Sequence, residues 1–146
     1  SYWMKLMAKQ TLEITCTEEE FYGVMCESAL GREWFKWHKG NPEFFILFEW
    51  FTTEAISKGH NNLSGWLIAN RVRWETSIAT KGNEYKIKND FIALFARLFM
   101  VRHQEYVGFF RTKRMKRLAR DVFKPVDRPV SMFDPVEGGF VYGDCE

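Results

Sequence analysis

The residues best suited to bind a ligand are the cations of a basic segment, residues 111–120, which reads RTKRMKRLAR. In a helix, four of these cations would recur at i, i+3, i+4 and i+7 and form one stripe: Lys113, Lys116, Arg117 and Arg120. Such a stripe suits nucleic acid, because each phosphate that it neutralises releases condensed counterions. The segment therefore predicts a nucleic-acid-binding surface made of Lys113, Arg114, Lys116, Arg117, Arg120 and, on a preceding strand, Lys86 and Lys88.

The distribution of charge along the chain favours an anionic partner. Residues 71–128 hold 15 of the 21 Lys and Arg but 6 of the 19 Asp and Glu, which gives this block a net charge of +9. The whole chain carries only +2, because acidic segments flank the basic block. The same pattern is also compatible with an acidic protein surface as the partner, or with a solvated helix that binds nothing.

Aromatic residues offer a second kind of binding surface, although most of the six tryptophans are expected in the core. Exposed tryptophans can stack on single-stranded bases, but they anchor protein interfaces at least as often. We therefore assign Trp34 and Trp37, together with Phe133 in the C-terminal tail, to a candidate protein interface. We also expect Trp66 and Trp74 to leave the inward face of their helix.

No motif in the sequence indicates an enzyme. It lacks the phosphate-binding loop GxxxxGK[ST], the dinucleotide-binding GxGxxG, the GxSxG elbow and the zinc-binding HExxH. Glu84-Tyr85-Lys86 has the ExK form of metal-dependent nucleases, but no aspartate that could supply a second carboxylate precedes Asp90. The histidines are scattered and the three cysteines form no close pair, so we expect neither a metal site nor a cofactor.

The elements that must position these residues are mainly helices. Helix start signals predict three main ones: Asn41-Pro42 opens a helix over residues 41–58, Ser64 caps one over 64–76, and Asn89 or Asp90 caps one over 91–103. Their expected inward residues are Phe44, Phe45, Leu47, Phe48, Trp50 and Phe51 in the first helix, Leu67, Ile68 and Val72 in the second, and Phe91, Leu94, Phe95, Leu98 and Phe99 in the third, whose Arg97 falls off the stripe.

Two strands complete the expected fold. Residues 84–88 alternate strictly between polar and apolar side chains, and residues 106–110 form a second apolar run that could pair with them. Three helices with a two-stranded ribbon predict a small, mostly helical α+β domain that could resemble a winged helix.

The chain has the length of one domain with extensions at both ends. Residues 1–40 form an N-terminal extension with a short strand and a short helix, which the capping box Thr17 and Glu20 opens. Residues 41–120 form the core domain with the ribbon and the basic helix. Residues 121–146 hold three of the four prolines, which predicts an extended tail.

The sequence predicts neither membrane insertion nor export. Its densest apolar stretch, FFILFEWF at residues 44–51, is about half a bilayer span and contains Glu49. The N-terminus lacks the basic and apolar regions of a signal peptide. We therefore expect a cytoplasmic protein.

The stretch from Arg71 to Arg114 resembles a group of small bacteriophage and prophage proteins of unassigned function. Members of that group share an RWxT segment, a TxGxxxKI strand, an ARLFM helix and a GFFRT ending, all of which occur here. With the preceding helix, the resemblance covers residues 41–114. It implies a phage origin and a place in the cytoplasm of an infected bacterium, and it brings no catalytic residues.

Two non-enzymatic functions fit these observations. The first is a small phage-type accessory protein that binds nucleic acid through the basic stripe, with DNA as the expected ligand, although the sequence does not distinguish DNA from RNA. The second is a phage-encoded stoichiometric inhibitor that binds a host defence or nucleic-acid-processing protein, with Trp34, Trp37 and Phe133 as anchors.

Overall fold

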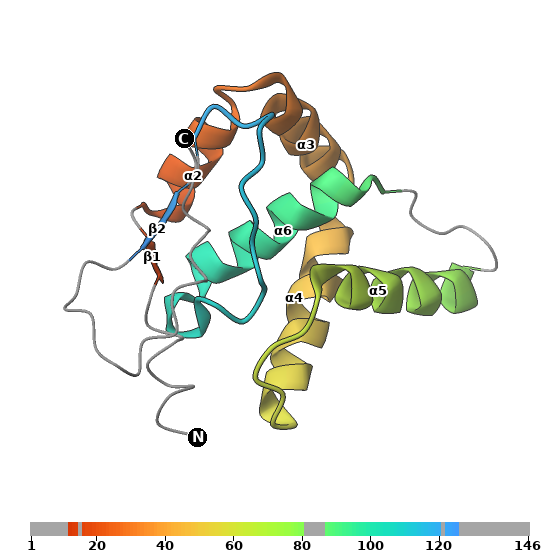
Figure 1. The fold of residues 1–146 in the computed structure, drawn as a ribbon. Coiled ribbons are helices and arrows are strands. Elements are labelled where there is room, and N and C mark those ends of the chain that lie inside the picture. Colours follow the sequence, from red (N-terminus) through yellow and green to blue (C-terminus); the bar gives the residue numbers. More distant parts are fainter. Residues whose placement is uncertain (1–11, 15, 81–86, 121, 126–146) are drawn as a thin grey trace, which may run out of the picture.

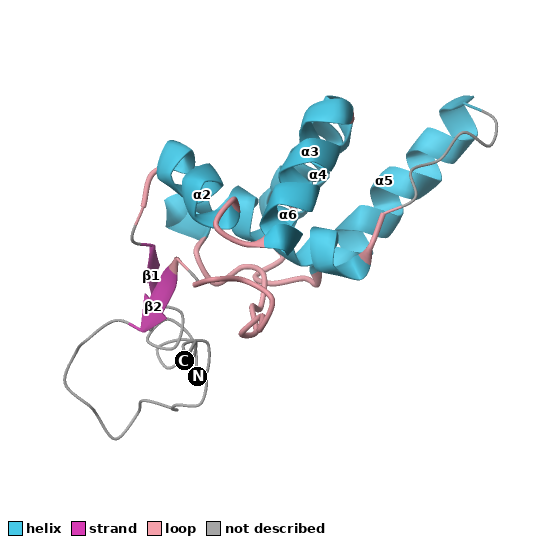
Figure 2. Cartoon of the chain, turned by 90° about the horizontal axis from the view of Figure 1, so that it is seen from above, coloured by secondary structure: helices cyan, strands magenta, loops and turns pink. Residues whose placement is uncertain are grey.

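The computed structural model describes residues 12–14, 16–80, 87–120 and 122–125. Within these ranges the chain forms five α-helices (Figure 1): α2 (Glu18–Met25), α3 (Ala29–Gly40), α4 (Pro42–Ser57), α5 (Gly65–Thr80) and α6 (Asn89–Arg102). A 3-10 helix, η1 (Gln104–Tyr106), follows α6. Two three-residue strands, β1 (Leu12–Ile14) and β2 (Phe123–Pro125), pair in antiparallel fashion (Figure 2).

Helix α6 is the centre of the fold. The other four helices all contact it, and Figure 1 shows it crossing the middle of the molecule. Its predicted inward stripe is confirmed, and burial extends beyond that stripe to nearly the whole helix: Phe91, Ile92, Leu94, Phe95, Ala96, Arg97, Leu98, Phe99, Met100 and Val101. A helix buried around its circumference needs neighbours on every side, which explains why the apolar residues of α6 exceed a single stripe.

Aromatic rings pack between α6 and helices α3 and α4. The ring centroid of Phe95 lies 5.4 Å from that of Trp34 on α3 and 5.0 Å from that of Phe44 on α4. Farther along α6, the Phe99 ring lies 5.7 Å from Phe110, edge to face. These side chains are fully buried, so the core is a continuous aromatic cluster built around one helix.

Local signals set most of the helix starts as predicted. Thr17 and Glu20 form the expected capping box at α2, and the Ser64 hydroxyl accepts from the Leu67 N–H at the start of α5. Pro42 is the first residue of α4, but the Asn41 side chain does not cap that helix, because its amide donates to the Trp37 carbonyl at the end of α3. The N-cap of α6 is Lys88, so the prediction of Asn89 or Asp90 is wrong.

The predicted α+β class with a two-stranded ribbon is wrong, because the fold is helical. Residues 106–110, expected as a strand, form the end of η1 and turns, with Gly108 at φ +95°. Phe109 and Phe110 are buried there, and the Phe109 carbonyl accepts from the Leu63 N–H at 3.3 Å. Burial in turns therefore explains the apolar run. The other predicted strand lies mostly outside the described residues.

The basic segment, residues 111–120, is not helical either, and the predicted i, i+3, i+4, i+7 stripe does not form. The segment runs irregularly beside α6, with turns at residues 116–119 (Figure 1), and we call it the cationic loop. It buries Thr112 and Leu118, which lie six positions apart and would face different sides of a helix. Packing against the core therefore overrides the local helical pattern.

Two predicted core residues lie at the surface. Trp50 of α4 is 58% exposed and Leu67 of α5 is 49% exposed. Each occupies the face of its helix opposite the buried residues. Most of the other predicted inward residues of α4 and α5 are buried, including Phe48 and Val72.

A buried arginine fastens the cationic loop to the core. Arg97 is 1% exposed, and its Nη2 donates to the Lys113 carbonyl oxygen at 2.7 Å. Its Nη1 donates to the Ala93 carbonyl oxygen, one turn earlier in α6, at 3.2 Å. A buried charge is tolerated only when its hydrogen bonds are made, so these carbonyls allow Arg97 to lie in the core.

Replacing Arg97 with methionine should destabilise the protein by about 1.5–3 kcal/mol, the usual contribution of a hydrogen bond to a charged group. The substitution leaves the Lys113 carbonyl without its donor, so trypsin should also cleave the cationic loop faster than in the wild type. Urea denaturation and limited proteolysis measure the two effects. Arg111→Met, at an exposed position of the same loop, should change stability by less than about 0.5 kcal/mol. Equal stability losses in the two variants would contradict the anchoring role.

Candidate functional site

The cationic loop carries six cations and no acidic residue. Two of them are held by carboxylates from other elements. Arg117 Nη1 lies 2.9 Å from Asp90 Oδ2 at the start of α6, and Arg120 donates two hydrogen bonds, of 2.9 and 3.1 Å, to Glu27. The hydrogen bonds from Arg120 lower the pKa of the Glu27 carboxyl. Both pairs lie in the C-terminal half of the loop, which keeps a net positive charge because it has six cations and no acidic residue.

The remaining predicted residues of the loop, Lys113, Arg114 and Lys116, are exposed. Within the described part of the chain, no carboxylate lies within ion-pair distance of the Lys113 or Lys116 ammonium. Their charge is therefore available to an anion in solution. The structure thus brings five predicted residues together on one loop, although not along one helix face.

The structure describes only one of the two lysines that were predicted to extend the site from the preceding strand, Lys86 and Lys88. Lys88 lies just before α6, where its Nζ is 3.6 Å from Glu33 Oε1 and 5.4 Å from the centroid of the Phe91 ring. It is close in sequence to Asp90, the partner of Arg117, so it lies near the same end of α6 as the cationic loop. Lys86 lies outside the described residues, as do the other two residues of the ExK pattern.

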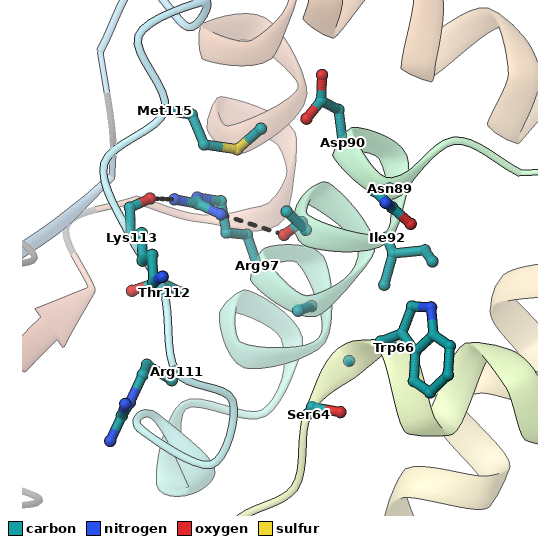
Figure 3. A pocket seen from close by; sticks show the side chains of 13 residues that line it. Ser64, Trp66, Asn89, Asp90, Ile92, Arg97, Arg111, Thr112, Lys113 and Met115 are labelled. Atoms are coloured by element: carbon teal, nitrogen blue, oxygen red, sulfur yellow. Dashed lines mark hydrogen bonds between the residues drawn. The ribbon is translucent and has the colours of Figure 1, made fainter.

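A pocket of about 440 Å³ opens beside the cationic loop (Figure 3). The first turn of α5, the N-terminal half of α6 and residues 111–115 of the loop surround it. Its lining includes five apolar side chains, which are Trp66, Ile92, Ala93, Ala96 and Met115. Asn89 and Asp90 line it from the start of α6, and Lys113 lines it from the loop. The pocket therefore joins an apolar interior to polar and cationic edges.

Small residues create this pocket. A Cβ on Gly65 would lie 3.3 Å from Ile92 Cγ2 and 3.5 Å from Ala96 Cβ, so glycine lets α5 begin close against α6. Ala93 and Ala96 leave open space that larger side chains on α6 would fill. Sequence reasoning missed the pocket, although a capping serine followed by Gly65-Trp66 signals a helix that starts in close contact.

Neither of the two described residues predicted as protein-interface anchors is exposed. Trp34 is fully buried, and its ring packs edge to face on Phe95. Trp37 is partly buried against the core, with its ring centroid 5.5 Å from that of Phe44. Phe133 lies outside the described residues. Core packing explains both tryptophans, because α3 is enclosed by α2, α4 and α6.

The second cluster of titratable groups joins α2, α4 and α6 through Arg102. Its guanidinium lies 3.0 Å from a Glu18 carboxylate oxygen and 2.9 Å from Glu49 Oε2, which the His103 ring also contacts at 2.6 Å. The Tyr22 hydroxyl donates to Glu18 at 3.2 Å. Burial, together with the Glu18 charge, raises the pKa of Tyr22 to about 12. Each of these side chains makes a hydrogen bond or an ion pair with another, so we assign the cluster a structural role in joining the helices.

His38 lies at the inner end of this cluster. Its ring stacks on Trp34 with centroids 5.5 Å apart, and its Nε2 lies 3.3 Å from the Tyr22 hydroxyl. Its Nδ1 is buried and has no hydrogen-bond partner among the described residues. Burial lowers the pKa of His38, an effect that the Glu18 charge opposes and the Arg102 charge reinforces.

This lowered pKa predicts a loss of stability in mild acid. As the pH falls through the usual histidine range, the unfolded chain protonates His38 before the folded chain does, so the free energy of unfolding decreases. His38→Phe keeps a ring against Trp34 and removes the titration. Its free energy of unfolding, from urea denaturation at about pH 7.5 and about pH 5, should fall less than that of the wild type. An identical fall in both proteins would contradict this role for His38.

Comparison with known proteins gives no functional assignment to set beside this geometry. No protein-family model, curated protein or solved structure matches the chain. None of the described helices has the length and apolar character needed to cross a bilayer. Likewise, the described residues contain no group of three or more His, Cys, Asp or Glu side chains that could hold a metal ion. The cationic loop and the adjacent pocket are therefore the candidate site.

Proposed function

We propose that this chain is a small phage-type accessory protein that binds nucleic acid without catalysing a reaction. The observation that carries the proposal is the cationic loop, which holds six cations and no acidic residue, and in which Lys113 and Lys116 have no carboxylate partner among the described residues. An exposed excess of positive charge on one loop suits the phosphate backbone, which binds through counterion release and requires no helical spacing. DNA is the first ligand to test, and the cytoplasm of an infected bacterium is the proposed setting.

The way in which the loop is held supports this proposal. Arg97 fixes its backbone from inside the core, and Asp90 and Glu27 hold the side chains of Arg117 and Arg120. Cations on a fixed loop lose less conformational entropy on binding than cations on a flexible segment. Lys113 and Lys116 then contact phosphate, whereas Asp90 and Glu27 offset the charges of the two paired arginines.

The Lys113→Ala/Lys116→Ala double variant should weaken DNA binding and lower the slope of log affinity against log salt by about 1 to 2, because each lysine neutralises about one phosphate. Fluorescence anisotropy with labelled duplex and single-stranded DNA, from low to near-physiological salt, measures both quantities.

The matched control is Lys39→Ala/Lys58→Ala, which removes the same charge from exposed positions on α3 and at the end of α4. Its affinity should stay within about twofold of the wild type once the change in net charge is screened by salt. The proposal fails if the wild type binds no nucleic acid at low salt, or if both double variants weaken binding equally.

Exposed apolar side chains favour a second candidate function, the stoichiometric inhibitor of a host protein. Trp50 is 58% exposed and Trp74 is 64% exposed, and tryptophan is a frequent anchor of protein interfaces. These two residues replace the buried Trp34 and the partly buried Trp37 as the candidate anchors. Ile46, one turn before Trp50 on α4, is 63% exposed and extends the apolar surface.

This second function predicts that Trp50→Ala/Trp74→Ala abolishes capture of a specific host protein, identified by mass spectrometry after pull-down from bacterial lysate. DNA binding by the same variant should be unchanged. The cationic-loop double variant should still capture that protein, although more slowly, because rim charges mainly affect association rates. Capture that survives loss of both tryptophans would rule out this interface.

A further inference from the structure

We propose that the pocket beside α5 holds one unstacked base of a single-stranded nucleic acid, with the Trp66 indole as its stacking surface. The inference rests on the proposed function, because the cationic loop would bring the phosphate backbone to the pocket. It goes beyond that function by naming single strands as the ligand and Trp66 as the residue that selects them over duplexes.

The pocket has the size and lining of a small-ligand site. Its volume of about 440 Å³ lies within the range of about 300–1,000 Å³ that is common for such sites. Ile92 and Ala96 are nearly fully buried, and Met115 is partly buried against the core from the loop side. An apolar interior of this kind suits the faces of a planar aromatic group better than a phosphate or a sugar.

Trp66 is positioned to stack. It is 59% exposed although it lines the pocket, so one part of the indole remains available to a ligand. The Ser64 cap and the close approach of Gly65 to α6 fix the first turn of α5, which sets the position of the indole. In Figure 3, Trp66 lies on the α5 side of the pocket and Met115 lies on the loop side.

Polar groups at the pocket edge suit the rim of a base. The exposed Asn89 side chain has both donors and an acceptor, which can pair with the polar edge of a base. The neighbouring Asp90 carboxylate holds Arg117, which places a cation of the loop at the same edge. Lys113 also lines the pocket, whereas the Arg111 side chain points away from the other labelled residues in Figure 3.

The preference for single strands follows from the free energy that is needed to expose a base. A base in a duplex is paired and stacked, and moving it into a pocket costs a few kcal/mol, whereas a single strand pays little of this cost. Stacking of one base on an aromatic side chain is tolerant of sequence, because every base has an aromatic face. A single pocket beside a cationic loop therefore favours single strands without strong sequence preference.

The test compares Trp66→Ala with its matched control, Trp74→Ala, which removes an exposed tryptophan from the same helix outside the pocket. The probes are a labelled single-stranded DNA of about 12 nucleotides, the RNA of the same sequence, and a blunt hairpin duplex. Trp66→Ala should weaken single-strand binding about 5- to 150-fold and leave the salt slope unchanged, because stacking involves no counterion release. Trp74→Ala should bind as the wild type does.

A second variant, Ala93→Phe, fills the pocket from α6 and leaves every cation in place. It should reproduce the loss of single-strand binding, and urea denaturation of each variant confirms that it is folded. The relative losses with DNA and RNA show which of the two the pocket accepts.

Three results would overturn the inference. If Trp66→Ala and Ala93→Phe bind single strands as the wild type does, while loss of Lys113 and Lys116 weakens binding, the base pocket fails and the proposed function stands. If Trp66→Ala weakens duplex and single-strand binding equally, the pocket does not select strand state. If the wild type binds no nucleic acid, the inference and the proposed function fail together.

Discussion

Burial of α6 around nearly its whole circumference is the constraint on which the rest of this structure depends. Four helices must surround it, and aromatic side chains from two of them, α3 and α4, meet at Phe95. Each neighbour therefore turns its most apolar face inward and leaves the opposite face to solvent. This division explains why Trp34 is buried in the core, while Trp50 and Trp74 are exposed.

The same constraint places Arg97, the one charged side chain that is buried among the described residues, at the centre of the fold. Because a charge in a core needs hydrogen-bond partners, Arg97 requires the carbonyl of Lys113 to be nearby. Core packing and loop conformation are thus coupled through one side chain. The cations that follow Lys113 are displayed on a backbone that the core itself holds in place.

The surface charges fall into two groups with different roles. Arg71, Arg102 and Lys88 join neighbouring helices through Glu54, Glu18 and Glu33, and contribute mainly to the arrangement of the helices. Lys113 and Lys116 have no such partner in the part of the chain that the structure describes, and they contribute to the excess charge of the cationic loop. Exposed ion pairs stabilise a fold only slightly, so the balance between paired and unpaired charges bears more on binding than on stability.

The sequence by itself determined the starts of α2, α4 and α5 and the inward stripe of α6, because caps, proline and a 3.6-residue period act within a few residues of the chain. It also located the basic segment, but not its shape. Only the tertiary structure decided that residues 106–120 form turns and a loop, that Trp34 is core, and that a pocket forms at Gly65. These outcomes depend on partners distant in sequence: Leu63 for Phe109, Arg97 for Lys113, and α6 for Gly65.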